Sequence, residues 1–178
     1  MLAFQDESGI SEKPVIQRTW APKGQTPILQ SSGSWKNLSM TGTLVATPFG
    51  LKPRLFLRIQ PGSVKAPHIL AYLKELRRHI QGRKVMLFWD GLPAHRAKTV
   101  SAYMKSEKQW LRPVRFPAYA PELNPVEYLW AAMKKKYLAH LPVKGLPAIK
   151  KAIRRSKLRM ARNTDTLFGF LKASRLFR

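Results

Sequence analysis

Nine carboxylates occur in the whole chain of 178 residues, and three of them stand where a side chain could take part in chemistry. Asp6 follows the first apolar residues, in FQDES, and Asp90 comes at the end of the apolar run Val85–Trp89. Glu127 lies in the string APELNPVEYLW, where a helix is expected to begin. Carboxylate oxygens are the ligands that hard divalent cations such as Mg²⁺ prefer in proteins. The three acids are therefore candidates for one metal site.

Each of these acids also has a structural interpretation that needs no metal. Asp6 could be a turn residue, and Asp90 with Gly91 forms the dipeptide Asp-Gly, which is typical of tight turns. Asn124 as N-cap, with Glu127 three residues later, matches a helix capping box. Taken one at a time, the residues leave both interpretations open.

The periodicity of apolar residues indicates the elements that must position the acids. Strands are expected at 2–4 running into Asp6, and at 15–20, 39–47, 54–59, 85–89 and 114–116. Helices are expected at 66–80, 98–110, 126–140, 146–160 and 164–171. Strands followed by alternating helices and strands predict a single α/β domain, with a mixed sheet and helices on its faces. In such sheets functional groups collect at the carboxyl ends of neighbouring strands, where the two aspartates are expected.

The charge of the chain points to a polyanionic partner. Its 33 Lys and Arg residues against nine acids give a formal net charge of +24, and nucleic acid is the first candidate. Residues 128–178 hold 14 basic side chains and one acid, Asp165. Seven basic side chains of this segment are candidates for binding phosphates: Lys134, Lys135, Lys136, Lys150, Lys151, Arg154 and Arg155. A solvated helix surface is the alternative.

Composition excludes several other classes of protein. A hydrophobic content of 44% is too high for a disordered basic tail. The absence of cysteine excludes disulfides, thiolate zinc sites and cysteine nucleophiles. No apolar run approaches the ~20 residues that cross a bilayer, and the first residues do not resemble a signal peptide. We therefore expect no membrane association and a cytoplasmic, nucleoid-associated protein.

Four segments, in order, resemble the catalytic domain of DDE transposases, most closely the bacterial insertion-sequence group related to mariner elements. They are FQDES at 4–8, WAPKGQTP at 20–27, WDGLPAH at 89–95 and FPAYAPELNPVEYLW at 116–130. The last is the most specific, and the resemblance covers about residues 1–140. It implies a ribonuclease H-like fold for a catalytic domain at 1–143. Residues 144–178 are then a basic helical C-terminal extension of the same domain.

Carried onto this sequence, the resemblance implies that Asp6, Asp90 and Glu127 are the catalytic residues and bind the metal. The 36 residues between the last two are close to the usual separation in the family. Two Mg²⁺ or Mn²⁺ ions are expected. His95 matches a histidine that commonly follows the second aspartate, and it could act near the scissile phosphate or pack and cap in its loop. Asn124 is expected to orient Glu127.

The implied function is metal-dependent cleavage of DNA at transposon ends, followed by strand transfer into target DNA. Relatives recognise those ends with an N-terminal helix-turn-helix portion, which is expected to be encoded separately or lost here. A homodimer on DNA is also expected. The chain departs from the family at Gly91, where members often carry asparagine, and Trp130 is assigned to the core. A non-catalytic DNA-binding module, an inert truncated transposase and a ribonuclease H-like repair nuclease are the alternatives.

Overall fold

The computed structural model of the chain describes residues 1–13, 20–26, 28, 36–49, 51–117, 120–139 and 145–177. Three expectations fall at least partly outside these residues. They are the strand at 15–20, of which only Trp20 is described, the end of the third helix at 140, and the domain boundary at 143/144.

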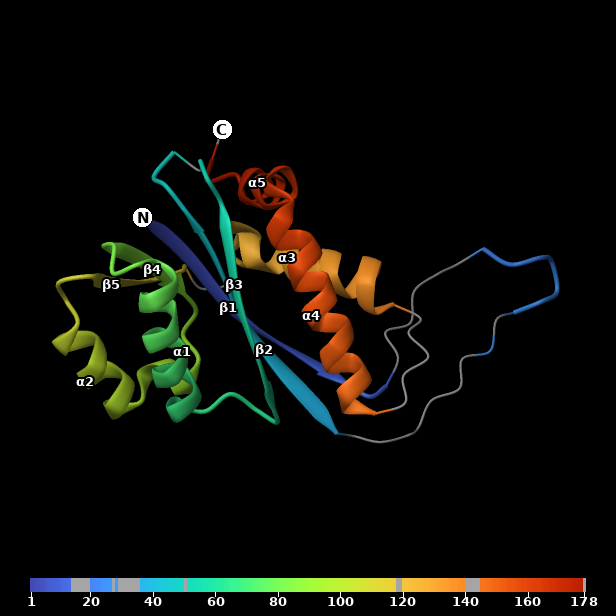
Figure 1. Ribbon diagram of the computed structural model, residues 1–178, viewed down its shortest axis with the longest axis horizontal. Coiled ribbons are helices and arrows are strands. Elements are labelled where there is room, and N and C mark those ends of the chain that lie inside the picture. The colour runs from blue at the N-terminus through green and yellow to red at the C-terminus, as the bar shows by residue number, and fades with distance from the viewer. Residues whose placement is uncertain are drawn as a thin grey trace.

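Five strands form one mixed sheet in the order β3-β2-β1-β4-β5 (Figure 1). The first three strands pair antiparallel, and they are β1 (Leu2–Ser11), β2 (Asn37–Ala46) and β3 (Arg54–Pro61). On the other side of β1, β4 (Val85–Trp89) pairs parallel with it, and β5 (Leu111–Arg115) pairs parallel with β4. β1 therefore lies at the centre of the sheet, between an antiparallel half and a parallel half.

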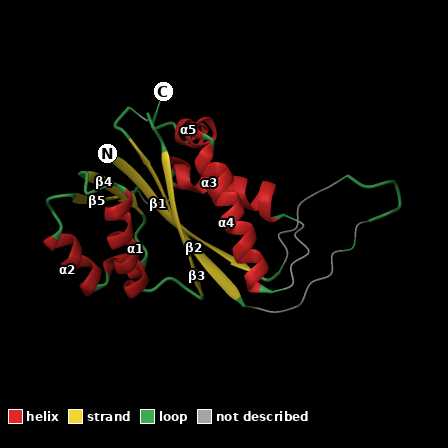
Figure 2. Cartoon of the chain, in the orientation of Figure 1, coloured by secondary structure: helices red, strands yellow, loops and turns green. Residues whose placement is uncertain are grey.

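Helices cover both faces of this sheet (Figure 2), as the sequence predicted. On one face, α1 (Ala66–His79) and α2 (Lys98–Ser106) pack over β4 and β5. On the other face lie α3 (Pro125–Ala132), α4 (Leu146–Arg162) and α5 (Thr164–Ala173). Two buried apolar clusters result, one on each side of the sheet. Among the described helices, none is both long enough and apolar enough to cross a membrane.

The prediction that Asp6 follows the first strand is wrong. The strand continues through Asp6 and Glu7 to Ser11, because ten residues of β1 pair in register with β2. Asp6 lies in the middle of this pairing, opposite Gly42. The polar residues interrupt the apolar pattern without ending the strand, since the backbone hydrogen bonds to β2 do not depend on side-chain polarity.

Other helix ends also differ from the prediction. The helix expected to run to residue 110 ends at Ser106, and turn hydrogen bonds to the Glu107 carbonyl lead the chain into β5. The helix expected at 126–140 consists of α3 and a π-helical segment, Met133–Leu138. Short 3₁₀ turns at Pro93–Arg96 and Pro121–Leu123 were not predicted, and each precedes an element near the site.

Glu12 joins the end of β1 to the start of α4. Its side chain is buried, and Oε1 accepts a hydrogen bond of 2.9 Å from the Leu146 backbone N–H. The N-cap of α4 is Gly145, which has no side chain to cap the helix. A carboxylate at this position satisfies one of the unpaired N–H groups and interacts favourably with the helix dipole.

Replacing Glu12 with alanine is therefore expected to lower the free energy of unfolding by about 1–2 kcal/mol, the typical cost of losing a helix cap. Glu12→Gln keeps an acceptor and should lose less. Urea denaturation followed by circular dichroism measures both changes, with Glu122→Ala as a control at an exposed acid. Equal losses at positions 12 and 122 would contradict the capping role.

Candidate metal centre

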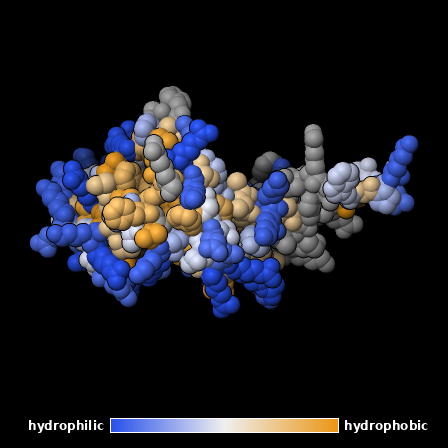
Figure 3. All heavy atoms as spheres, turned by 90° about the horizontal axis from the view of Figure 1, so that it is seen from above, coloured by the Kyte–Doolittle hydropathy of each residue, from blue (hydrophilic) through white to orange (hydrophobic). Residues whose placement is uncertain are grey.

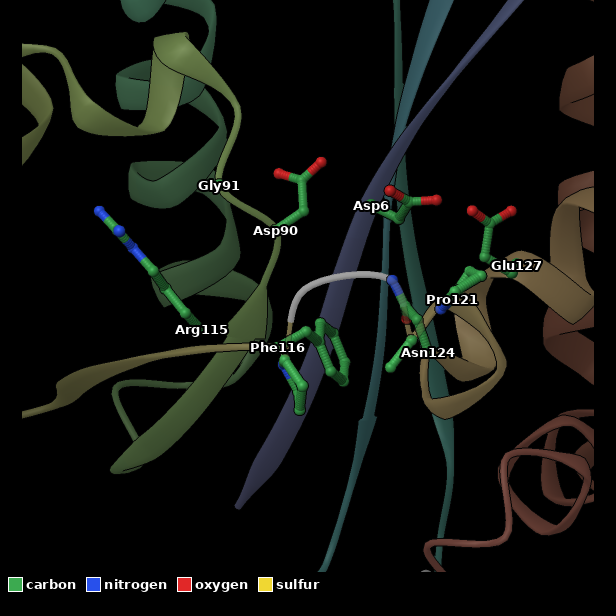
Figure 4. Close-up of a pocket in the computed structure, with 10 residues that line it drawn as sticks. Asp6, Asp90, Gly91, Arg115, Phe116, Pro121, Asn124 and Glu127 are labelled. Atoms are coloured by element: carbon green, nitrogen blue, oxygen red, sulfur yellow. The ribbon is translucent and has the colours of Figure 1, made fainter.

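The parallel pairing of β1 with β4 brings two acids, Asp6 and Asp90, to the same height along neighbouring strands. Phe4 lies opposite Phe88; Asp6, within β1, and Asp90, just past the end of β4, each come two residues later. Glu127 reaches the same place from the first turn of α3. Figure 4 shows the three carboxylates pointing in the same direction, from three different elements. They line one pocket of about 470 Å³.

Asp6 carries the clearest electrostatic signature of the site. Its side chain is only 9% exposed, and Oδ2 accepts a hydrogen bond of 2.8 Å from the Trp130 indole Nε1. Burial raises the pKa of Asp6 to about 7, and the nearby negative charge of Glu127 contributes to the increase. The hydrogen bond from Trp130 opposes this increase only partly. Burial and the charge of Glu127 thus disfavour the ionised form of Asp6, and a cation bound between the carboxylates would offset their mutual repulsion.

Asp90 lies in a turn directly after β4. Its Oδ1 accepts hydrogen bonds from the Leu92 backbone N–H, at 3.1 Å, and from His95 Nδ1, at 2.9 Å. Burial raises the pKa of Asp90, but the hydrogen bonds and the charge of His95 outweigh it and hold the pKa below its usual value. Asp90 thus accepts the backbone N–H two residues ahead, as aspartates do in Asx turns, and these contacts hold a carboxylate that stays ionised.

His95 connects Asp90 to a second acid, Glu7. Its Nε2 lies 3.0 Å from Glu7 Oε1, and its ring stacks on Trp89 with the ring centroids 4.2 Å apart. Burial lowers the pKa of His95, but the two carboxylates more than offset that effect and raise the pKa to about 9. His95 is therefore an imidazolium at neutral pH, held between two carboxylates, and it orients Asp90.

Glu7, Asp90 and His95 form the one described group of three whose ligand atoms lie within 4.8 Å of one another. A protonated imidazole has no lone pair for a metal, and both ring nitrogens already contact carboxylates. We therefore interpret this group as an ion triad, which leaves the carboxylates of the pocket as the candidate metal ligands. Glu7 was not among the predicted site residues, because its partner His95 is distant in the sequence. Neighbouring residues of a strand face opposite sides of a sheet, so Asp6 and Glu7 belong to different clusters.

Asn124 is the N-cap of α3, as the capping pattern predicted, and Glu127 lies three residues later in the first turn of that helix. Its Oδ1 accepts the Val126 backbone N–H at 3.1 Å, and its Nδ2 donates to the Gln5 carbonyl at 3.4 Å. The start of α3 is thereby tied to β1. The Asn124 backbone N–H donates to the Pro121 carbonyl at 2.9 Å rather than to Glu127. The Glu127 carboxylate lies at the pocket instead, beside Asp6 (Figure 4).

Gly42 makes room for Trp130 beneath the site. Trp130 is buried in the core, as predicted, and its indole also donates to Asp6. A Cβ on Gly42 would lie 2.7 Å from Cη2 of Trp130 and 2.9 Å from Cζ2. No side chain fits at position 42 without moving the indole. Gly42 in β2 therefore allows Trp130 of α3 to donate its hydrogen bond to Asp6 of β1. The sequence offered no local signal for this contact.

The seven basic candidates are not part of the pocket. Lys134, Lys135 and Lys136 lie on the π-helical segment, and the others lie on α4, where the core face is formed by residues 149, 153, 156 and 160. Among the described residues, the one basic side chain that lines the pocket is Arg115, at the end of β5. Sequence analysis missed it, although it pairs with Trp89, directly before Asp90. The rule that functional groups collect at strand ends indicates Arg115 only once β5 is known to lie beside β4.

Both the sequence and the fold of the chain are similar to those of known proteins. The family described as DDE superfamily endonuclease matches residues 1–150. The Mos1 mariner paired end complex with Mn has a TM-score of 0.71 and 21% identity, covering 98% of this chain and 53% of that chain. The Mos1 strand transfer complex has a TM-score of 0.71 and 20% identity, covering 98% and 52%.

The catalytic domain of Mos1 mariner transposase has a TM-score of 0.63 and 16% identity, with 98% of this chain and 78% of that chain covered. No curated protein sequence matches this chain. The chain spans about half the length of the Mos1 chains in the two complexes. At these identities the likeness concerns the fold, and it confirms the ribonuclease H-like fold that the sequence resemblance implied. Since the family match covers most of its length, the chain belongs to the DDE superfamily endonucleases.

Proposed function

We propose that this chain is the catalytic part of a DNA transposase, which cleaves phosphodiester bonds at transposon ends and transfers the cleaved strand into target DNA. The observation that carries the proposal is the meeting of Asp6, Asp90 and Glu127 at one pocket. Membership of the endonuclease family supports it, as does the likeness in fold to the Mos1 transposase complexes.

We propose Mg²⁺ or Mn²⁺ as the cofactor, with two ions held by Asp6, Asp90 and Glu127. The donor set fits such ions, because it consists of carboxylate oxygens and because burial, together with the nearby charge of Glu127, raises the pKa of Asp6, so that a cation would favour its ionised form. When bound, two such ions stabilise the attacking and leaving oxygens of a phosphoryl transfer.

The protein's own part in this reaction is to keep the ligands in place. Trp130 fixes one oxygen of Asp6, and His95 with the Leu92 N–H fixes one oxygen of Asp90. Asn124 sets the first turn of α3, from which Glu127 projects. Ligands whose rotamers are locked by neighbours need little reorganisation when substrate binds, which favours the transition state.

DNA is the proposed partner, and the seven basic side chains from Lys134 to Arg155 are proposed to contact phosphates without reading sequence. Figure 3 shows hydrophilic side chains around the margin of the molecule, where a polyanion could approach them. We also propose a homodimer on DNA. A helix-turn-helix portion outside this chain, encoded separately or lost, is proposed to recognise the transposon ends.

We further propose that residues 144–178 belong to the same domain as residues 1–143. Ile153 of α4 and Leu167 of α5 are fully buried in the apolar cluster that contains Trp130. A segment that supplies part of the core on one face of the sheet is expected to fold together with that sheet. The basic side chains of α4 are then held rigidly relative to the pocket.

The test is nicking of supercoiled plasmid by the purified chain with Mn²⁺. We expect nicked circles that disappear with EDTA and with Asp90→Asn, while Asp165→Asn, the same substitution at an exposed acid of α5, cleaves like wild type. A folded chain that binds plasmid but leaves it intact under all conditions would contradict the proposal, and would favour a non-catalytic DNA-binding module or an inert truncated transposase.

A further inference from the structure

A second hollow adjoins the metal pocket, on the side of α2. It has a volume of about 320 Å³, and its walls include the stacked rings of Trp89 and His95. Arg96, Ser101 and Arg115 supply its polar lining. Arg115 lines both this hollow and the metal pocket. Figure 4 shows its side chain extending away from the three carboxylates.

The two arginines bring positive charge that no described acid balances. Both are exposed, and no described salt bridge or side-chain hydrogen bond involves either. Elsewhere in the described structure, Arg58 pairs with Glu75 and Arg77 pairs with Glu107. The acids nearest the hollow are engaged by His95 instead. Two guanidinium groups at one small hollow therefore provide a site for an anion.

The chemistry of the hollow favours a phosphate that belongs to a polymer. A guanidinium group offers a planar fork of N–H donors that matches phosphate oxygens, and a serine hydroxyl can add one more donor. The neighbouring carboxylates repel a free anion, but a DNA strand held electrostatically by the other basic side chains of the chain brings its phosphates to the hollow with or without metal. Because Arg115 lines both, the hollow lies next to the metal pocket.

We propose that Arg96 and Arg115 together hold one backbone phosphate of the DNA strand, adjacent to the phosphate at the metal pocket. The proposal rests on the proposed function for the identity of the strand. The two arginines, on the β4–β5 side of the site, would position the DNA strand without reading its base sequence.

The test is DNA binding without metal, so that it does not depend on cleavage. Binding of a fluorescein-labelled 30-base-pair duplex in EDTA is followed by anisotropy over a range of salt concentrations. The variant Arg96→Gln/Arg115→Gln is compared with Arg78→Gln/Arg83→Gln, which removes two exposed arginines near the opposite end of β4. We expect the first variant to bind roughly 10-fold more weakly than the second, with a salt slope smaller by about 1.

Equal affinities and equal salt slopes for the two double variants would overturn the proposal. Unchanged thermal unfolding is expected for both, because all four side chains are exposed, and it excludes misfolding as the cause of weak binding. The plasmid assay keeps the two proposals separate. A chain that binds DNA without nicking it defeats the proposed function, whereas the comparison of the double variants still decides the phosphate site.

Discussion

Asp6→Asn is expected to abolish Mn²⁺-dependent nicking and, in the same protein, to stabilise the metal-free fold at pH 8. The loss of activity should be roughly 10³-fold or more, because a metal ligand that contributes several kcal/mol to the transition state is removed. The gain in stability has a separate cause. Asp6 is buried beside Glu127, and the folded protein must hold that negative charge without a cation when metal is absent.

The sign of the pH dependence follows from the pKa of Asp6, which is about 7 in the folded chain against an ordinary value of 3.8. Between these values the folded state binds a proton that the unfolded state has released, so stability falls as pH rises through this window. Above pH 7 the carboxyl is ionised in both states, and the cost reaches about 4 kcal/mol as an upper bound. An asparagine at this position carries no charge and removes this cost.

His95 contributes a second slope of the same sign at higher pH. Its pKa is raised from 6.5 to about 9, so the stability it supplies is complete below pH 6.5 and is lost as pH rises toward 9. Asp6→Asn leaves Glu7 and Asp90, the partners of His95, in place. The variant should therefore keep the slope above pH 7 and lose most of the slope between pH 4 and pH 7.

Urea denaturation in EDTA at pH 5, 6, 7 and 8 measures these slopes, with Asp165→Asn as the matched control. Asp165 is exposed, in the first turn of α5, and the same substitution there should leave the wild-type slope unchanged. Adding Mg²⁺ to the wild type at pH 8 should raise its stability, because ligand binding to the folded state alone is stabilising. If the Asp6→Asn variant kept the wild-type dependence of stability on pH, Asp6 would not be the group whose raised pKa causes that dependence.

The sequence predicted the acids of this site better than it predicted their surroundings, and the reason is physical. Asp90 follows a short apolar run, and Glu127 follows a Pro at the start of a helix, so local patterns identify both positions. Asp6 was placed after a strand that in fact continues to Ser11, because pairing with β2 is a long-range property. Local periodicity does not report which strand will be the partner.

The residues that sequence analysis missed depend on contacts between distant segments. Glu7 meets His95 across 88 residues, and Arg115 reaches the site only because β5 lies next to β4 in the sheet. The π-helical segment after α3 was also not predicted. Its residues continue the helical pattern of the sequence, which does not distinguish a π-helix from an α-helix. Strand order and packing decide these positions, and a single sequence does not reveal either of them directly.

Gly42→Ala is expected to lower both the free energy of unfolding and the nicking activity, because it displaces one side chain, Trp130. The added methyl group would lie 2.7 Å from Cη2 of Trp130, so the buried indole must shift, and overpacking of this kind costs about 1–3 kcal/mol of unfolding free energy. Trp130 also donates to Asp6 at 2.8 Å. A shifted indole releases that carboxylate, so nicking should fall roughly 10-fold or more at temperatures where the variant remains folded.

Two further variants separate this effect from simple destabilisation. Gly9→Ala places the same methyl group in β1, where nothing lies within 4 Å, and should change neither stability nor nicking much. Gly42→Ala/Trp130→Phe replaces the indole with a smaller ring that lacks the N–H donor, so it should recover stability relative to Gly42→Ala but not nicking. Recovery of both by the double variant would show that the indole fills space only, and that Asp6 is positioned without its hydrogen bond. Recovery of stability alone would establish Trp130 as the residue that links the packing of β2 and α3 to the orientation of Asp6.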